Sequence, residues 1–157
     1  MADHLNPCPR QASLEPLNPP IITNAQETIL ILHLCHESKA KEAYARLLPI
    51  AKGELAAEAI YYDAYFKNKE GKFEASNTTV QKLAKDFSGY KYYSAKGLVL
   101  MAKNFYALKD AYQATYILES VIENFKEYKE VVSEAQSELT IIKAEESKTN
   151  ASIKTKD

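Results

Sequence analysis

Two related stretches of the chain decide its fold: AEAIYYDAYFKNKEGKFEASNTTVQKLAKDF at residues 57–87, and SAKGLVLMAKNFYALKDAYQATYILESVIENF at residues 94–125. A single shift along the chain, the one that lays Ala64 on Ala102, brings them into register. The same shift matches Ser76 with Ala114, Val80 with Leu118, Leu83 with Val121, and Phe87 with Phe125. Apolar residues recur three and four positions apart in both stretches, which is the period of an amphipathic helix and not of a strand. The sequence therefore predicts an all-α fold.

The order of small and large residues in each stretch predicts helices that pack in pairs. A small residue is followed by another twelve positions later, and large apolar residues come four, seven and eleven positions after that. Small side chains allow the two helices of a hairpin to approach closely, and the large ones can fill the groove against the next hairpin. Because one hairpin cannot bury its own apolar face, we expect several of them to stack.

This spacing resembles the tetratricopeptide repeat (TPR), a helix–turn–helix unit of about 34 residues. Ala64 and Ala102 match the small residue of the family's first helix, and Ser76 and Ala114 match that of the second. The run Gly71-Lys72-Phe73 matches the Gly-x-aromatic turn between the helices. The family's Trp and its Pro after the second helix are missing, and the repeat in this chain is longer than that of the family. The resemblance implies a divergent, right-handed array of antiparallel helical hairpins, an α-solenoid.

A weaker copy precedes these two. Ala43, Leu47 and Ile50 reproduce the spacing of the second helix, and Ile31 stands at the small position of the first. The two clear copies are similar in style to the C-terminal repeats of long TPR proteins of Bacteroidetes, which usually carry many repeats and an export signal. That similarity implies that the chain is a fragment of such a protein or has an altered start.

Proline, glycine and polar segments divide the chain into three parts. Five of its six prolines precede residue 21, so residues 1–22 are expected to form a disordered arm. Residues 23–143 are expected to form the TPR-like domain of about three hairpins and a terminal helix, and residues 144–157 a disordered polar tail. After a first helix that begins near Thr23, the expected helices span residues 38–50, 54–68, 73–86, 92–108, 111–124 and 129–143.

Composition excludes several classes of protein. A net charge of −1 disfavours a strongly basic nucleic-acid binder, and the four glycines form no phosphate-binding loop. Apolar runs such as Ile29 to Leu32 are too short to span a membrane. No secretory signal is visible, which predicts a cytoplasmic location if the chain begins at its native start. The resemblance instead implies the bacterial periplasm or cell envelope if the chain is a fragment of an exported protein.

No recognisable catalytic constellation is present, and we predict a non-enzymatic protein without a cofactor. His33, Cys35 and His36 form the one cluster that suggests a metal, with His33 and His36 on one helical face. A buried Cys35 beside a histidine at a helix end explains the cluster without a metal. The run GYKYYSAKG at residues 89–97 combines lysines with tyrosines, as patches that bind nucleic acid do. Tyrosines buried at a hairpin junction explain it without a nucleic acid.

The resemblance to TPR proteins implies that a ligand lies along the inner face of the first helices of the hairpins. The positions on that face are Glu58, Tyr61, Tyr65, Asn68, Lys96, Val99, Lys103 and Tyr106. Aromatic anchors flanked by lysines suit an extended peptide that carries a carboxylate. The other interpretation is that Tyr61 and Tyr65 pack against the preceding hairpin and that the lysines are ordinary solvated charges.

The predicted function is protein–protein interaction through this groove, with a peptide or protein partner. One alternative is a structural end-cap of a longer scaffold, with no groove ligand of its own. It predicts self-association through the first helix, where residues 29–34 place apolar side chains on more than one face. A remote alternative is a small metal-binding protein that uses the cluster of His33, Cys35 and His36.

Overall fold

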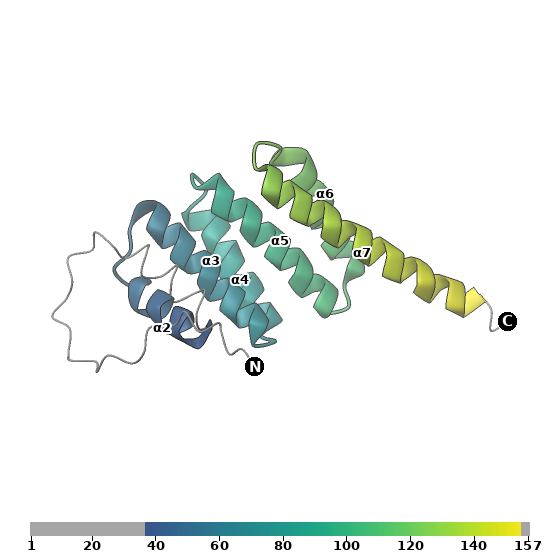
Figure 1. Cartoon of the computed structure of the whole chain (residues 1–157), viewed down its shortest axis with the longest axis horizontal. Coiled ribbons are helices and arrows are strands. Elements are labelled where there is room, and N and C mark those ends of the chain that lie inside the picture. The colour runs from purple at the N-terminus through teal and green to yellow at the C-terminus, as the bar shows by residue number, and fades with distance from the viewer. Residues whose placement is uncertain (1–36, 155–157) are drawn as a thin grey trace, which may run out of the picture. The chain divides into compact units, whose positions relative to one another are not determined.

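The computed structural model describes residues 37–154, and within that range it contains helices and no strand (Figure 1). The prediction of an all-α fold is confirmed. The chain divides into two compact units, residues 1–43 and 44–157, and the packing below is that of the second unit. The helices are α2 (Glu37–Leu47), α3 (Gly53–Lys69), α4 (Phe73–Asp86), α5 (Lys91–Ala107), α6 (Ala111–Asn124) and α7 (Lys129–Lys154).

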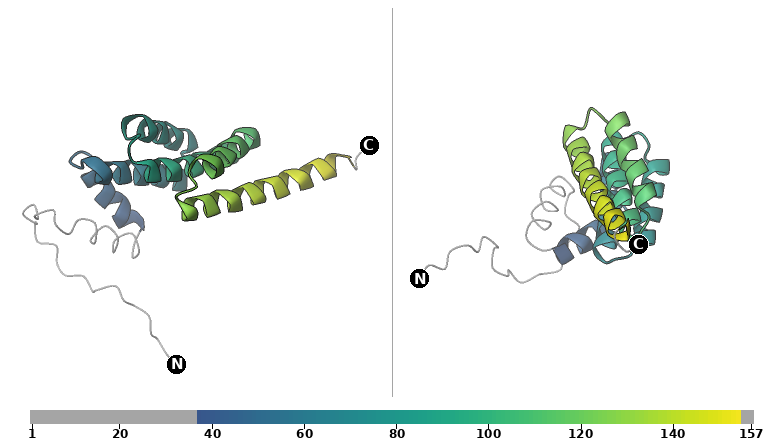
Figure 2. Two further views of the ribbon diagram at one scale, coloured as in Figure 1. Left: turned by 90° about the horizontal axis from the view of Figure 1, so that it is seen from above. Right: turned by 90° about the vertical axis from the view of Figure 1, so that its right-hand side faces the viewer.

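From α3 onward, each helix packs against the next one along the chain. In addition, α3 contacts α5 and α5 contacts α7, whereas the backbones of α4 and α6 are not neighbours in the described part of the chain. Helices α3, α5 and α7 therefore form one layer, and α4 and α6 form a second layer against it (Figures 1 and 2).

The helix boundaries repeat with the same shift as the sequence. Moving the ends of α3 and α4 along the chain by that shift gives the ends of α5 and α6. The same shift moves the start of α5 onto the start of α7. The turns repeat as well, because Gly71 and Lys109 both adopt a positive φ, of 74° and 68°. Phe87 and Phe125 end α4 and α6 with nearly the same backbone angles. Residues 53–154 thus contain two copies of one helix pair, followed by a helix that begins in the same register.

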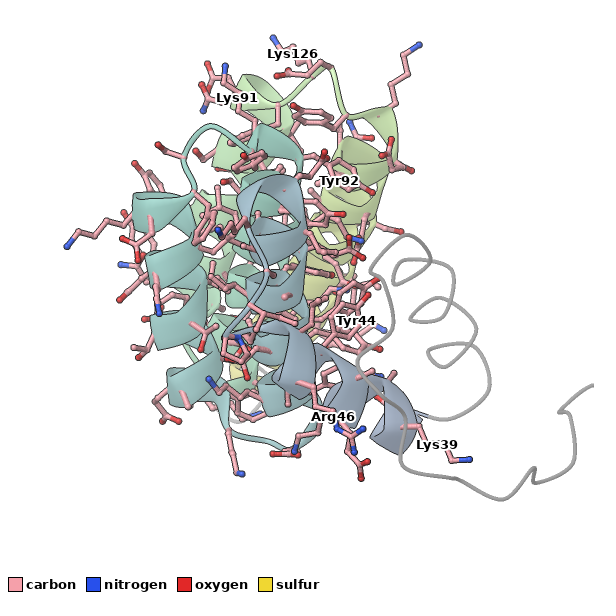
Figure 3. All side chains as sticks on the ribbon, turned by 90° about the vertical axis from the view of Figure 1, so that its left-hand side faces the viewer. Lys39, Tyr44, Arg46, Lys91, Tyr92 and Lys126 are labelled. Atoms are coloured by element: carbon pink, nitrogen blue, oxygen red, sulfur yellow. The ribbon has the colours of Figure 1, made fainter. Side chains whose placement is uncertain are left out.

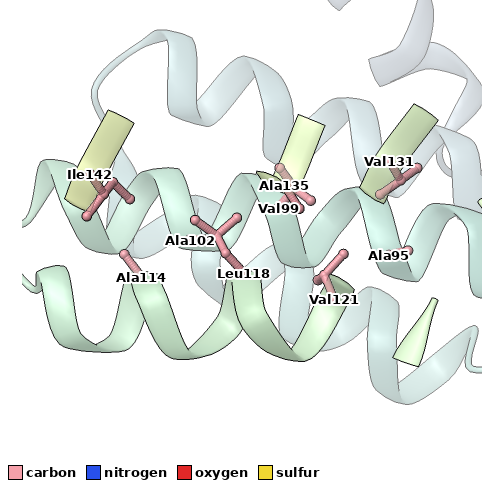
Figure 4. Packing of buried hydrophobic residues seen from close by; sticks show 9 residues of the cluster. All are labelled: Ala95, Val99, Ala102, Ala114, Leu118, Val121, Val131, Ala135 and Ile142. Carbon is pink, nitrogen blue, oxygen red and sulfur yellow. The ribbon is translucent and has the colours of Figure 1, made fainter. Parts of the chain in front are cut away.

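Small residues lie where the helices of each pair meet. The Ser76 hydroxyl donates to the backbone oxygen of Ala64 across 2.8 Å, and both residues are fully buried. Ala102 and Ala114 occupy the same two positions in the second pair and are also fully buried (Figure 4). A larger side chain at these positions would force the helices apart. The predicted role of the small residues is confirmed.

Large apolar residues of α4 and α6 join each pair to the following helix. Val80 and Leu83 of α4 share a buried cluster with Leu100 and Met101 of α5. Close packing there also depends on Gly97, since a Cβ atom on it would lie 3.1 Å from Val80 Cγ1. The second copy repeats the arrangement with α7: Leu118, Val121, Val131, Ala135 and Ile142 belong to the other cluster (Figure 4).

Two predicted helix ends are wrong. Helix α2 ends at Leu47, before Pro49, and Ile50 follows it in a turn with 61% of its surface exposed. Ile50 therefore does not continue the apolar face of that helix. Helix α7 runs on to Lys154 instead of ending near Lys143, because no proline or glycine interrupts it. Figure 2 shows its last turns extending past α5 and α6, so residues expected in a disordered tail are helical.

Several predictions fall on residues outside the described range. They are the arm at residues 1–22, the helix from Thr23, the small position at Ile31, the cluster His33, Cys35 and His36, and self-association through residues 29–34. In residues 37–154, none of the helices has the length and apolar character that crossing a membrane requires. The same range holds no group of three or more His, Cys, Asp or Glu residues suited to a metal ion.

Candidate functional site

A pocket of about 350 Å³ lies on the layer formed by α3, α5 and α7. Five of the eight predicted groove residues line it, which brings the two repeats together at one site. The lining residues are Tyr61, Tyr65, Asn68, Lys69, Lys96, Leu100, Lys103 and Glu134.

Tyrosine rings build the wall of the pocket. Tyr61 is buried and meets Tyr62 edge to face at 5.1 Å between ring centres, and Tyr62 in turn meets Tyr65 at 6.1 Å. The cluster continues to Tyr44 of α2 and Tyr92 of α5, both labelled in Figure 3. Burial, followed by the charge of Glu134, raises the pKa of Tyr61, so its hydroxyl stays protonated. The rings offer a rigid aromatic surface at little cost in side-chain entropy.

Lys96 brings a positive charge to this surface and forms no ion pair with the residues that the structure describes. Its Nζ lies 4.7 Å from the centre of the Tyr61 ring and 5.5 Å from that of Tyr92. No ion pair of Lys96 occurs among the described residues, and its side chain is half-buried. Burial lowers the pKa of Lys96, and the more distant carboxylates of Glu134, Glu58 and Glu130 only partly oppose this effect. An anion that enters the pocket would stabilise the charged form of Lys96.

Lys103 stands two turns further along α5 and is already paired. Its Nζ lies 2.7 Å from Glu134 Oε1 and 3.1 Å from Glu138 Oε1, both on α7. Burial alone would lower the pKa of Lys103, but the hydrogen bonds to these two carboxylates more than compensate, so the pKa is raised. The two predicted groove lysines are thus in different electrostatic states.

Asn68 is held in place by a buried polar network. Its Nδ2 donates to Asn104 Oδ1 at 2.6 Å, and Asn104 Nδ2 donates to Ser76 Oγ and Asn77 Oδ1 at 2.9 and 2.8 Å. Asn104 is fully buried, so these bonds replace its contacts with water. The network links α3, α4 and α5 beneath the pocket.

The remaining three predicted residues do not line this pocket. Glu58 accepts a hydrogen bond from the Tyr44 hydroxyl at 3.0 Å, beside the aromatic cluster. Val99 is 1% exposed and packs in the core, so it has no surface to offer a partner, and its place in the predicted groove is corrected. The Tyr106 hydroxyl donates to Glu145 and lines a second pocket, of about 560 Å³, with Lys109 and the end of α7.

Sequence reasoning missed Lys69, Leu100 and Glu134. The Lys69 Nζ lies 5.3 Å from the centre of the Tyr65 ring, so it is a second cation above an aromatic face. Glu134 holds the same position in α7 that Lys96 holds in α5, counted from the first residue of each helix. The shift that relates the two helix pairs moves Lys96 onto Glu134, so the sequence repeat already indicated this position.

The pocket combines aromatic surface with three lysines and one glutamate, in a chain whose net charge is −1. It suits a ligand with negative charge next to apolar atoms. Comparison of the chain with protein-family models, curated proteins and solved structures found no match.

Proposed function

We propose that the chain is a non-enzymatic protein-interaction module, a TPR-like array of helical hairpins whose pocket binds an acidic segment of a peptide or protein partner. The observation that carries this proposal is Lys96, a half-buried ammonium above Tyr61 that has no ion pair among the described residues.

Three features support the TPR-like part of the proposal. The helix boundaries recur at a constant spacing along the chain, as in an array of similar hairpins. Small residues lie at the contact within each pair, and in the first pair the Ser76 hydroxyl donates to the backbone oxygen of Ala64. The first helices of successive pairs touch one another while the backbones of the second helices α4 and α6 are not neighbours, which leaves the pocket on the layer of first helices. The resemblance implies a ligand on that same layer.

The electrostatics of the pocket favour an acidic ligand. A carboxylate near Lys96 would gain a charge-assisted contact with a cation that has already lost part of its hydration. Lys69 adds a second cation at the edge, and Tyr61 and Tyr65 offer aromatic surface for the neighbouring side chain. Because packed helices hold these groups in place, the module loses little conformational entropy on binding.

Selection from a displayed random-peptide library tests this function. The wild-type chain should enrich peptides with two or more acidic residues, and Lys96→Glu should lose them because it replaces the cation above the Tyr61 ring with a carboxylate. The matched control is Lys82→Glu, which makes the same charge change on an exposed lysine of α4. Equal enrichment by the wild type and Lys96→Glu, or no enrichment at all, would favour the structural end-cap instead.

A further inference from the structure

A row of carboxylates on α7 faces α5. Glu130, Glu134, Glu138 and Glu145 are spaced four, four and seven residues apart, which places them along one side of the helix. Glu134 and Glu138 pair with Lys103, and Glu145 accepts a hydrogen bond from the Tyr106 hydroxyl. At the start of α7, burial and the nearby Glu130 raise the pKa of Tyr92.

Two α5 side chains that contact this row, Lys103 and Tyr106, also belong to the groove predicted to receive a partner. Lys103 holds two carboxylates of α7, and the Tyr106 hydroxyl holds a third. Lys96, by contrast, has no carboxylate in ion-pair contact among the described residues. The chain's own last helix thus presents to α5 the chemistry that an acidic peptide would bring.

We infer that the carboxylate row of α7 is an internal ligand of α5 and sets how much negative charge a partner must carry to bind there. This inference rests on the proposed function and states which acidic partners the pocket would select. A tethered carboxylate acts at an effective concentration on the order of millimolar. A partner with one acidic residue can use Lys96 but cannot displace Glu134 and Glu138 from Lys103, whereas a partner with several acidic residues can compete.

The negative charges of the row can be removed without removing the buried contacts that hold α7 in place. Val131, Ala135 and Ile142 are buried in the core, whereas the side chains of Glu134 and Glu138 beside them remain partly exposed. Replacing these two glutamates by glutamine keeps their size and leaves the buried contacts in place. The electrostatic role can therefore be tested without detaching the helix.

The test compares the binding of a hexaglutamate peptide to the wild type and to the full-length double variant Glu134→Gln/Glu138→Gln, by isothermal titration at low salt. Removing two competing carboxylates should tighten binding by about three- to tenfold. Adding Lys103→Gln to the double variant should abolish the gain, since Lys103 is the cation that the row releases. Circular dichroism checks that helicity is unchanged in all variants.

The matched control is Glu123→Gln/Glu127→Gln, which makes the same charge change at exposed glutamates without an ion pair among the described residues. A similar gain in this control would overturn the inference, because net charge alone would then explain the effect. Equal affinity of the wild type and the α7 variant, including no binding by either, would also overturn it. The library selection with Lys96→Glu is independent of this comparison, so the two proposals can fail separately.

Discussion

Lys109 holds a backbone conformation that glycine adopts more easily. It has a φ of 68°, and its counterpart in the first helix pair is Gly71, with a φ of 74°. Side chains with a Cβ are strained in this left-handed region. Asp110, directly after it, accepts a hydrogen bond from the Gln113 backbone at 2.9 Å and so caps α6. The tight turn between α5 and α6 therefore forms despite the residue at its centre.

Lys109→Gly should stabilise the protein by about 0.5–1 kcal/mol, because relief of the backbone strain exceeds the added entropy of the unfolded chain. The reciprocal variant, Gly71→Lys, should destabilise it by a similar amount. Apart from its chain neighbours, no described residue has an atom within 4 Å of a Cβ built on Gly71, so the backbone conformation would be responsible. Urea denaturation followed by circular dichroism measures both changes. A loss of stability in Lys109→Gly would contradict this account.

At the scale of elements, the buried network around Asn104 fixes how α5 sits on α3 and α4. Asn104 makes three hydrogen bonds to side chains of those two helices. An apolar residue would pack there in several ways, whereas the amide is satisfied in one arrangement only. The network also holds Asn68 at the rim of the pocket.

Asn104→Ala should lower the free energy of unfolding by about 2–3 kcal/mol, because it leaves buried polar partners unsatisfied and opens a small cavity. Asn124→Ala is the matched control, since the Asn124 amide donates to Ser120 at the exposed end of α6. The control should change stability by less than about 0.5 kcal/mol. Thermal and urea unfolding compare the two variants, and equal effects would show that the network adds no stability of its own.

Local signals in the sequence account for most element boundaries. Gly71, the small residues and the recurring apolar positions predicted α3 to α6 to within one residue at each end. The end of α7 was predicted wrongly, because polar residues were taken as a stop although no proline or glycine stands there. Polarity alone does not end a helix whose residues have good helix propensity.

Across the whole molecule, the resemblance to TPR proteins predicted part of the site and not its electrostatics. It indicated which positions of α3 and α5 share a face, and five of those eight residues line one pocket. Which of Lys96 and Lys103 is ion-paired among the described residues depends on α7, which packs directly against α5 as well as α6. Such pairing between distant segments leaves no local pattern, so the contribution of Glu134 and Glu138 became visible only in the structure.

The proposed function requires that acidic ligands bind in the tyrosine- and lysine-lined pocket on α3, α5 and α7. The most direct measurement is an NMR titration of the isotope-labelled full-length chain with hexaglutamate. We predict that the largest shifts fall on Tyr61, Tyr65, Lys96 and their neighbours in the pocket, and that Lys96→Met removes them. Shifts centred on the exposed lysines of α4, or no shifts at millimolar peptide, would contradict the claim.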